Sequence, residues 1–310
     1  MTIVVAGSTG LVGSAIIREL NRRGESVIGI NRKVVDLLDR KSTFEFINAA
    51  KPDLVIDAAA IVGGIGANNA YPVDFLSKNL QIQNNLMDAS HSANVERFVF
   101  LGSSCIYPRD CQQPIKEDYL LTGPLEQTNS AYAISKIAGI ELIKSYRKQF
   151  NRRWISLMPT NMYGPFDNFE LETSHVLPAF INKFVSAAKN HTQSVTLWGS
   201  GKPRREFLHS NDFAKATVIA AEKYDAAQHL NVGTGEDVTI AELAETVASH
   251  SGFKGEIRWD ASKPDGTLRK VLDVTNIKNI GWAPEIPLKE GIASTIEWFK
   301  ENENRLVKRY

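Results

Sequence analysis

The sequence has few of the features that define several large classes of protein. Only two of its 310 residues are cysteine, Cys105 and Cys111. Two cysteines are too few for a disulfide scaffold, and their spacing is not the paired CxxC of a zinc ribbon or redox motif. The six histidines are spread along the chain without the close spacing of a local metal-ligand pair. We therefore expect no metal site, and a reducing compartment suits the chain best.

The sequence also lacks an excess of one charge and a long apolar run. It has 36 lysine and arginine residues against 35 aspartate and glutamate residues, a balance that does not suit a nucleic-acid-binding surface. No apolar stretch reaches the roughly 18 residues of a membrane-spanning helix. No basic segment precedes the first apolar run, as one would in a signal peptide. We expect neither a nucleic-acid nor a membrane partner, and a cytoplasmic location.

What the sequence does contain is a regular alternation of strand-like and helix-like segments. Runs rich in β-forming residues occupy 2–6, 26–30, 54–60, 97–103 and 154–159. Segments with helical periodicity occupy 12–23, 42–50, 73–91 and 130–149. Strands that alternate with helices predict a parallel sheet. We therefore expect an α/β fold built on a Rossmann-type, doubly wound parallel sheet.

Two lobes are expected from the chain length and from a change of pattern after residue 165. The pattern there becomes less regular, and 207–221 and 229–233 then resemble a helix and a strand again. We predict a dinucleotide-binding Rossmann domain over 1–165, rejoined by about 207–235, and a smaller, interleaved substrate-binding domain over 166–310. Helices 73–91 and 130–149 are long enough to offer a face to a second subunit, so we expect a homodimer.

A glycine-rich turn follows the first predicted strand directly. It reads GSTGLVG, with glycines at 7, 10 and 13, and it opens the first helix at Leu11. Such a turn lets the backbone approach a pyrophosphate, and the helix N-terminus favours negative charge. Strand, glycines and helix occur in the order that dinucleotide binding requires, which favours this function over a purely structural turn. The expected cofactor contacts are Gly7, Ser8, Thr9, Gly10, Leu11, Val12 and Gly13.

The second predicted strand ends in Asn31 and Arg32, where a carboxylate would normally accept a hydrogen bond from the ribose of NAD. An arginine suits the 2′-phosphate of NADP instead. The alternative is that Arg32 is a solvated surface charge. We therefore prefer NADP(H) as the cofactor, bound by both residues.

Residues suited to carbonyl reduction follow the fourth predicted strand. Ser103 stands at its carboxyl end, where ligands bind in such sheets. Tyr132 and Lys136, in YAISK, share one face of a helix. A tyrosine has an ordinary pKa of about 10, so it needs a neighbouring positive charge to exchange protons at neutral pH. Lys136 supplies that charge and can also reach a cofactor ribose, and Ser103 would donate to the same substrate oxygen.

These motifs resemble the extended short-chain dehydrogenase/reductase family. The similarity extends from the first strand to the final helix and is greatest to its nucleotide-sugar enzymes, in six segments: LGSSCIYP (101–108), PTNMYGPFDNF (159–169), SHVLPA (174–179), WGSGKPRREFLH (198–209), NVGTG (231–235) and DASKPDGTLRKVLD (260–273). The resemblance implies NADPH-dependent 3,5-epimerisation and 4-reduction of GDP-4-keto-6-deoxy-D-mannose. It makes the first domain an NADP-binding domain and the second a GDP-sugar-binding domain.

The resemblance also assigns two residues to the epimerisation. A C4 ketone acidifies the protons on both neighbouring carbons, so inversion needs a base on one face and an acid on the other. The resemblance makes Cys105 the base and His175 the acid. Taken alone, Cys105 fits a small buried apolar residue better than a catalytic one. If the strand continues beyond Ser103, alternation points Cys105 to the same side as that serine, which favours catalysis.

The remaining site residues rest on the resemblance as well. For the substrate it indicates Lys183, Trp198, Arg205 and Asp265. Arg204 could replace its neighbour Arg205, and Trp198 could instead belong to the core of the second lobe. For the cofactor it adds a further set around the sheet: Leu101, Gly102, Ser103, Ser104, Lys136, Pro159, Thr160, Asn161, Met162 and His175.

The chain departs from its relatives in two places, and other functions remain open. Thr9 stands where many relatives have an arginine, which removes one cation near the 2′-phosphate, and Ala131 replaces a frequent proline. A related GDP-4-keto sugar, as in the route to GDP-L-colitose, would need the same catalytic set. A simple 4-reductase would not need Cys105 and His175. A non-catalytic NADP sensor would not need an intact Tyr132 and Lys136. His209 is expected to be structural, and Cys111 has no assigned role.

Overall fold

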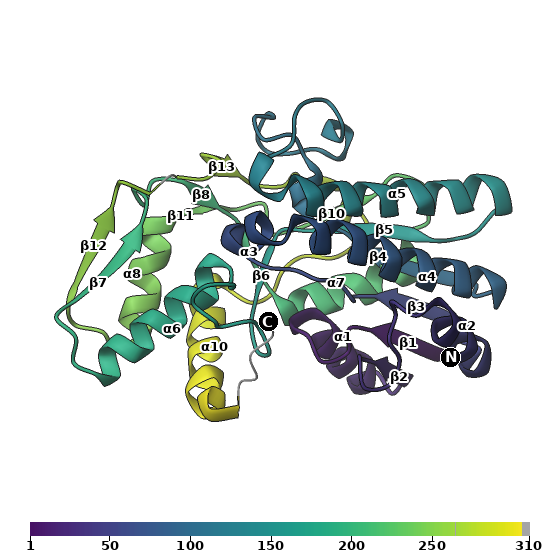
Figure 1. The fold of residues 1–310 in the computed structure, drawn as a ribbon, viewed down its shortest axis with the longest axis horizontal. Coiled ribbons are helices and arrows are strands. Elements are labelled where there is room, and N and C mark those ends of the chain that lie inside the picture. The colour runs from purple at the N-terminus through teal and green to yellow at the C-terminus, as the bar shows by residue number, and fades with distance from the viewer. Residues whose placement is uncertain (264, 306–310) are drawn as a thin grey trace.

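A six-stranded parallel sheet forms the centre of the first lobe (Figure 1). The computed structural model describes residues 1–263 and 265–305. The sheet order is β10 (Leu230–Val232), β5 (Ile155–Pro159), β4 (Arg97–Leu101), β3 (Leu54–Asp57), β1 (Thr2–Ala6) and β2 (Ser26–Ile30). Its central strands are almost wholly buried, because helices cover both faces of a parallel sheet. The predicted doubly wound α/β fold is confirmed.

Helices pack on the two faces of this sheet. On one face α1 (Leu11–Arg22) packs against α7 (Ser210–Lys223). The other face carries α2 (Arg40–Ala50), α4 (Asn79–Ser92) and α5 (Ser130–Phe150), which lie side by side in Figure 1. The short helix α3 (Ile65–Ala70) precedes α4. The chain runs from β1 to β2 on one side and from β3 to β4 on the other, so the strand order reverses between β1 and β3, and ligands bind at such a point.

The predicted helix 73–91 is not one regular helix. Its first part, η1 (Asp74–Lys78), has the wider π-helical turn, and the α-helix α4 begins at Asn79. The side chain of Asn79 explains the difference, since its amide donates to the carbonyl of Phe75 (2.7 Å). That carbonyl is the acceptor that the backbone of Asn79 would use in an α-helix.

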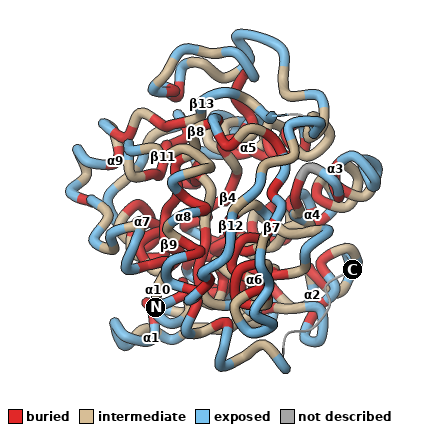
Figure 2. Tube along the Cα trace, turned by 90° about the vertical axis from the view of Figure 1, so that its left-hand side faces the viewer, coloured by how far each residue is buried: buried red, intermediate tan, exposed pale blue. Residues whose placement is uncertain are grey.

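The second lobe has its own core (left in Figure 1). Helices α6 (Val176–Lys189), α8 (Ile240–Ser251) and α10 (Leu288–Asn302) pack on one another. Small sheets flank them: β12 (Glu256–Asp260) with β7 (Ser194–Trp198), and β11 (Val238–Thr239) with β8 (Arg204–Arg205) and β13 (Arg269–Lys270). A further pair, β6 (Asn161–Tyr163) and β9 (Phe207–His209), runs between the lobes' cores. Figure 2 shows buried segments concentrated in the interior and exposed ones in the outer loops.

The chain crosses between the two cores more often than two continuous halves would. After β9 it returns to the first core through α7 and β10, within the segment expected to rejoin. It returns again after β13, where Leu272, Val274, Ile277 and Trp282 pack into the first core around the short helix α9 (Thr275–Asn279). The apolar residues of 272–282 therefore belong with the sheet, although they follow most of the second lobe in sequence.

Several elements end earlier than their sequence pattern suggests. The strands expected over 54–60 and 97–103 stop at Asp57 and Leu101. Segment 207–221 begins as a strand, because the ring of His209 accepts a hydrogen bond from the backbone of Asn211 (3.2 Å) and caps α7 there. The strands predicted over 2–6 and 26–30 match the structure, and the other predicted elements differ by one or two residues at their ends.

No helix within residues 1–263 and 265–305 is long and apolar enough to cross a membrane.

Candidate active site

One large cleft, with a volume of about 1860 Å³, lies where the sheet's carboxyl ends meet the second lobe. It is lined by the glycine turn, the ends of β2, β3, β4 and β5, the first turns of α5 and α6, and the loops around β7, β8 and β13. All the predicted site residues line it except Ser8 and Gly13. The folded chain therefore gathers into one cavity residues that are up to about 260 positions apart.

The first and third glycines of the turn are required by steric contact. A Cβ atom on Gly7, which has φ +75°, would lie 2.4 Å from the carbonyl oxygen of Ala58. A Cβ atom on Gly13 would lie 2.2 Å from the carbonyl oxygen of Gly7. Gly10 precedes α1, and no side chain caps the amides of the first turn. Gly13 thus packs directly against the backbone of the turn, and the uncapped amides at the N-terminus of α1 can bind an anion.

Two cations line the cleft beyond the end of β2. Arg32 and Lys33 are both exposed and both line the cavity. The side chain of Asn31 also lines it, but its oxygen accepts a hydrogen bond from the backbone of Lys33 (2.9 Å) and so shapes the turn. Lys33 was not singled out from the sequence, although it directly follows Arg32. It adds a positive charge on the side of the cleft where Thr9 supplies none.

Lys136 is fixed in place at the end of β4. It is 3% exposed, and its ammonium group donates to the carbonyl of Leu101 (2.9 Å) and lies 5.8 Å from the ring centre of Tyr132. Burial lowers the pKa of Lys136 to about 8. Tyr132, Lys136 and Ser103 all line the cleft. The two helical residues thus share one face, as their spacing predicts.

Cys105 lines the cleft for a different reason from the one expected. The strand does not continue past Leu101. Ser103 instead accepts a hydrogen bond from the backbone of Cys105 (3.2 Å) and caps a 3₁₀ turn, η2 (Ser104–Ile106). The prediction that strand alternation orients the thiol is therefore wrong. The turn itself leaves Cys105 partly exposed in the cavity.

Two polar side chains that sequence reasoning missed contact this thiol. The amide of Asn129 is 3.4 Å from the sulfur of Cys105, and the ammonium of Lys270 is 3.8 Å from it. The sulfur therefore has a hydrogen-bond donor and a positively charged group beside it. Asn129 lies three positions before Tyr132, so helical spacing could have revealed it. Lys270 is 165 positions from Cys105, and no local spacing points to it.

His175 lies across the cleft from the sheet, immediately before α6. It is exposed and lines the cavity, and its pKa is lowered, first by the protein atoms around it and then by the positive charge of Lys270. The imidazole is therefore mainly neutral at neutral pH in the ligand-free protein. A bound anion that offsets the charge of Lys270 would raise the pKa again.

The structure separates the two adjacent arginines of β8. Arg204 forms an ion pair with Asp237 (2.5 Å) and does not line the cleft. Arg205 lines the cleft, and burial lowers its pKa. Their side chains leave the strand on opposite sides, as alternation requires. Arg205 is thus the one that can reach a ligand in the cavity.

The other predicted substrate residues surround Arg205 in the second lobe. Trp198 is 71% exposed and lines the cleft, so the alternative that it belongs to the core is wrong. Asp265 accepts two hydrogen bonds from Ser200, at 2.8 and 2.6 Å, which joins two loops at the cavity's edge. Lys183 lines the cleft from α6, where burial lowers its pKa. A flat aromatic surface and two cations thus occupy one end of the cleft.

The loop after β5 is held by one buried carboxylate residue. The carbonyl of Glu206 accepts hydrogen bonds from the side chains of Asn161 (2.9 Å) and Thr160 (3.3 Å). Its carboxylate accepts from the backbones of Gly235 (2.7 Å) and Leu272 (2.9 Å). Glu206 therefore joins the segments that bring Asn161 and the Lys270 strand to the cavity.

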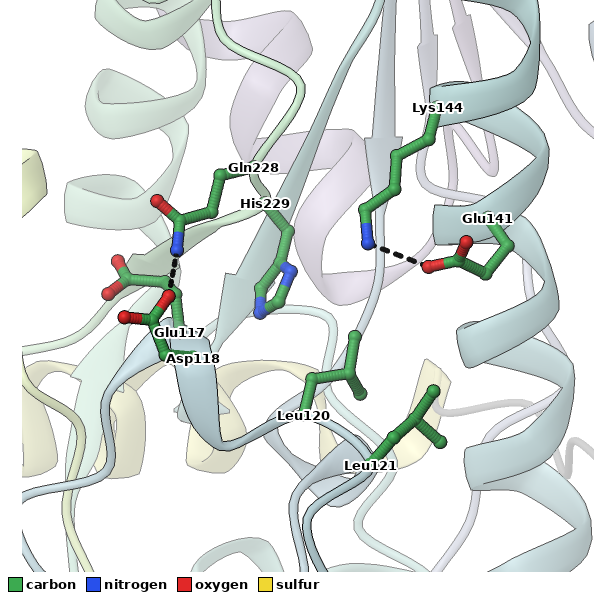
Figure 3. A pocket seen from close by; sticks show the side chains of 8 residues that line it. All are labelled: Glu117, Asp118, Leu120, Leu121, Glu141, Lys144, Gln228 and His229. Atoms are coloured by element: carbon green, nitrogen blue, oxygen red, sulfur yellow. Dashed lines mark hydrogen bonds and ion pairs between the residues drawn. The ribbon is translucent and has the colours of Figure 1, made fainter.

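A smaller pocket of about 220 Å³ lies beside α5 (Figure 3). It is polar, with Gln228 bonded to Asp118 (2.6 Å) and Lys144 bonded to Glu141 (2.7 Å). His229 lines it and contacts the hydroxyl of Tyr107 (2.9 Å), which lines the large cleft. None of the predicted site residues lines this pocket, so the candidate site is the larger cleft.

Together, the switch-point cleft, the glycine turn and the Ser103, Tyr132 and Lys136 group define a Rossmann-fold enzyme of the dinucleotide-dependent reductase and epimerase class. A family model agrees: residues 3–233 match the NAD dependent epimerase/dehydratase family. The chain belongs to this family, and the resemblance stated from the sequence is confirmed.

Close relatives within the family are GDP-L-fucose synthases. The chain is 48% identical to the GDP-L-fucose synthase of Escherichia coli (strain K12), covering 98% of both chains. It is 48% identical to GDP-L-fucose synthase 1 of Arabidopsis thaliana, covering 97% of this chain and 93% of the relative. Among solved structures, a GDP-L-fucose synthetase from Naegleria fowleri bound to NADP has a TM-score of 0.91 at 29% identity, covering 99% of this chain and 96% of that one.

Proposed function

We propose that this chain converts GDP-4-keto-6-deoxy-D-mannose to GDP-L-fucose, by epimerisation at C3 and C5 followed by NADPH-dependent reduction at C4. The observation that carries the proposal is the presence of Cys105 and His175 in the same cleft as Tyr132 and Lys136. A simple reductase would need only the last two of these. The names of the close relatives support the same reaction and substrate.

Cys105 is the proposed base and His175 the proposed acid. Cys105, whose sulfur contacts Asn129 and Lys270, acts as a thiolate that removes a proton beside the C4 carbonyl. His175 lies at the start of α6, across the cleft from Cys105, and returns a proton to the carbon from the opposite face. The negative diphosphate of the substrate offsets the charge of Lys270, which favours the protonated imidazole that this step requires.

Tyr132 and Ser103 act on the oxygen at C4 in both stages. During epimerisation they donate hydrogen bonds to the enolate oxygen, which stabilises the intermediate's charge. During reduction Tyr132 gives a proton to the same oxygen. The ammonium of Lys136, beside the tyrosine ring, keeps the tyrosine's proton transfer favourable near neutral pH.

The residues around the glycine turn fit NADP(H). Its pyrophosphate suits the uncapped N-terminus of α1 and the close-packed glycines, and its 2′-phosphate suits Arg32 and Lys33. When bound, NADPH supplies the hydride for C4. The other residues proposed to hold it are Ser8, Thr9, Leu11, Val12, Asn31, Leu101, Gly102, Ser104, Pro159, Thr160, Asn161 and Met162.

The second lobe is the proposed GDP-sugar domain. Arg205 and Lys183 supply cations for the diphosphate, Trp198 a flat surface for the nucleotide, and Asp265 a polar contact. The proposed division is therefore a cofactor lobe over 1–165 and about 207–235, with the sugar lobe drawn from 166–310 apart from the segment 272–282 that packs on the sheet.

The test is incubation with GDP-4-keto-6-deoxy-D-mannose and NADPH in heavy water. We expect deuterium at C3 and C5 and a product with the stereochemistry of GDP-L-fucose. Reduction without deuterium entry would indicate that the protein is a simple 4-reductase. Turnover only of the 3-deoxy substrate would point to the colitose route. NADP binding without any turnover would indicate a non-catalytic NADP sensor.

We also propose a homodimer that is located in the cytoplasm. Apolar side chains are exposed beside α4 and α5: Tyr71 (54%), Val73 (74%) and Ile134 (47%). The two helices lie side by side and offer one continuous face (Figure 1). Sedimentation of the protein and of Ile134→Glu tests the dimer, and a monomeric parent chain would refute it.

The thiol proposed as base must stay reduced, which suits the cytoplasm. Cell fractionation checks the location.

A further inference from the structure

A buried carboxylate lies beneath Lys136 that the reaction above does not use. Asp57 is the last residue of β3 and is 1% exposed. One oxygen of its carboxylate accepts a hydrogen bond from the backbone of Ala59 (3.1 Å). The other is buried without a hydrogen-bond partner in the described part of the chain. An unpaired carboxylate in a sheet is costly unless a charge compensates it.

The sheet register directs this carboxylate towards Lys136. Asp57 pairs directly with Phe100 on β4, so the two side chains point to the same face of the sheet. Phe100 faces α5, because a Cβ atom on Gly139 of that helix would lie 2.3 Å from its ring. The ammonium of Lys136 lies 4.8 Å from the centre of the Phe100 ring. Asp57 is therefore next to Phe100, and the ammonium of Lys136 lies over the ring of Phe100.

We infer that Asp57 is a positioning residue that acts through Lys136, holding the buried ammonium in its charged form so that it can serve Tyr132. The inference deepens the proposed function and rests on it. Asp57 does not line the cleft, so it reaches neither substrate nor cofactor directly. It is a negative charge next to Lys136, which does line the cleft.

The charges around the pair agree with this role. Burial lowers the pKa of Lys136, and Asp57 is the group that raises it. Burial likewise raises the pKa of Asp57 to about 6, against the opposing effect of Lys136. The other neighbours are neutral: Ala6 of β1 pairs with Asp57, and Gln83 of α4 donates to the carbonyl of Ser135 (2.8 Å). Tyr132 is the remaining titratable group that lies against Lys136.

The test measures Lys136 in the ligand-free full chain, labelled with ¹³C at the lysine Cε atoms, by NMR at increasing pH. The variant Lys136→Arg identifies the signal. In the wild-type chain we expect the main titration near pH 8 and a smaller inflection near pH 6, as Asp57 gains its charge. In Asp57→Asn the inflection should vanish, and the main titration should move down by about one pH unit.

A matched control is Asp212→Asn. Asp212 is also buried, accepts backbone hydrogen bonds with one carboxylate oxygen, and has no hydrogen-bond partner on the other. It belongs to α7 on the opposite face of the sheet, so its loss should leave the titration of Lys136 unchanged. If Asp57→Asn does not fold, the inflection in the wild-type chain decides.

Two results overturn the inference: a wild-type titration without the lower inflection, or an unchanged midpoint in folded Asp57→Asn. The alkaline limb of ketone reduction should move with the NMR midpoint. Because the titration needs neither substrate nor cofactor, its outcome is separate from that of the proposed function. A coupled pair in a protein that turns over no GDP-sugar would refute the function and leave the charge coupling in place.

Discussion

At the scale of single residues, what distinguishes this site is how each reactive group is surrounded. Cys105 has an amide on one side and an ammonium on the other, whereas Cys111 lies outside the cleft against the first core. The two cysteines have the same chemistry, so their surroundings decide which can act as a base. The contrast provides a variant and its control within one chain.

Replacing Cys105 by serine should slow the entry of solvent deuterium at C3 and C5 by on the order of 10²–10⁴, because a hydroxyl is a far weaker base than a thiolate. Reduction of a substrate supplied with its stereocentres already inverted should continue. Mass spectrometry of the product in heavy water measures both. Cys111→Ser should exchange at the parent rate, and normal exchange in Cys105→Ser would exclude the thiol as the base.

Arg32→Ala should raise the KM for NADPH roughly ten-fold and leave that for NADH nearly unchanged, since only NADPH carries the 2′-phosphate. Steady-state kinetics with the two cofactors gives the comparison. Arg40→Ala is the control, because Arg40 pairs with Asp88 (2.7 Å) away from the cleft. Equal effects on both cofactors would remove Arg32 from the phosphate site.

At the scale of secondary-structure elements, local signals in the sequence explain many beginnings and ends. Thr239 and Glu242 form a capping box at the start of α8: Thr239 accepts from the backbone of Glu242 (3.0 Å), and Glu242 accepts from that of Thr239 (2.7 Å). Gly252, at φ +84°, ends the same helix. α8 packs on α6 and α10, so its cap contributes to the stability of the second lobe.

Thr239→Ala should lower the free energy of unfolding by about 1 kcal/mol, the usual cost of losing such a cap. Denaturant unfolding followed by circular dichroism measures the change. Thr246→Ala, in the same helix, removes only a hydrogen bond back to the carbonyl of Glu242 (2.8 Å) and should have a smaller effect. Equal losses in the two variants would argue against the cap.

At the scale of the whole molecule, two buried histidines make the fold sensitive to acid. His209 and His229 are 3% and 2% exposed, and burial lowers the pKa of each to about 4 from an ordinary 6.5. The unfolded chain therefore binds more protons than the folded one between these values. Stability must fall as the pH is lowered from 6.5 towards 4, by up to about 3 kcal/mol for each ring.

His209→Asn should reduce this loss, because asparagine can still cap α7 but does not take up a proton. Unfolding measured at pH 7 and at pH 4.5 gives the slope. The exposed His250 serves as the control, and His250→Asn should keep the parent slope. A slope that His209→Asn leaves unchanged would show that the buried ring does not contribute.

Much of the fold could be predicted because it depends on local patterns. The alternation of strands and helices, the glycine turn and the Tyr132 and Lys136 spacing are all short-range signals. The surroundings of the thiol were not predictable in this way, because the strand stops at Leu101 and Ser103 caps a 3₁₀ turn that holds Cys105. Nor was the choice between Arg204 and Arg205, which depends on where Asp237 lies.

The sequence by itself determined the parallel sheet, the phosphate-binding turn and the types of reactive side chain, since each depends on residues within one or two turns of chain. Only the tertiary structure decided which of those side chains share a cavity and what charge each one meets. Packing of segments far apart in sequence brings Lys270 to Cys105. It also brings Asp57 next to Phe100, whose ring the ammonium of Lys136 contacts. Electrostatic effects depend on distance in space, and a linear pattern does not contain that distance.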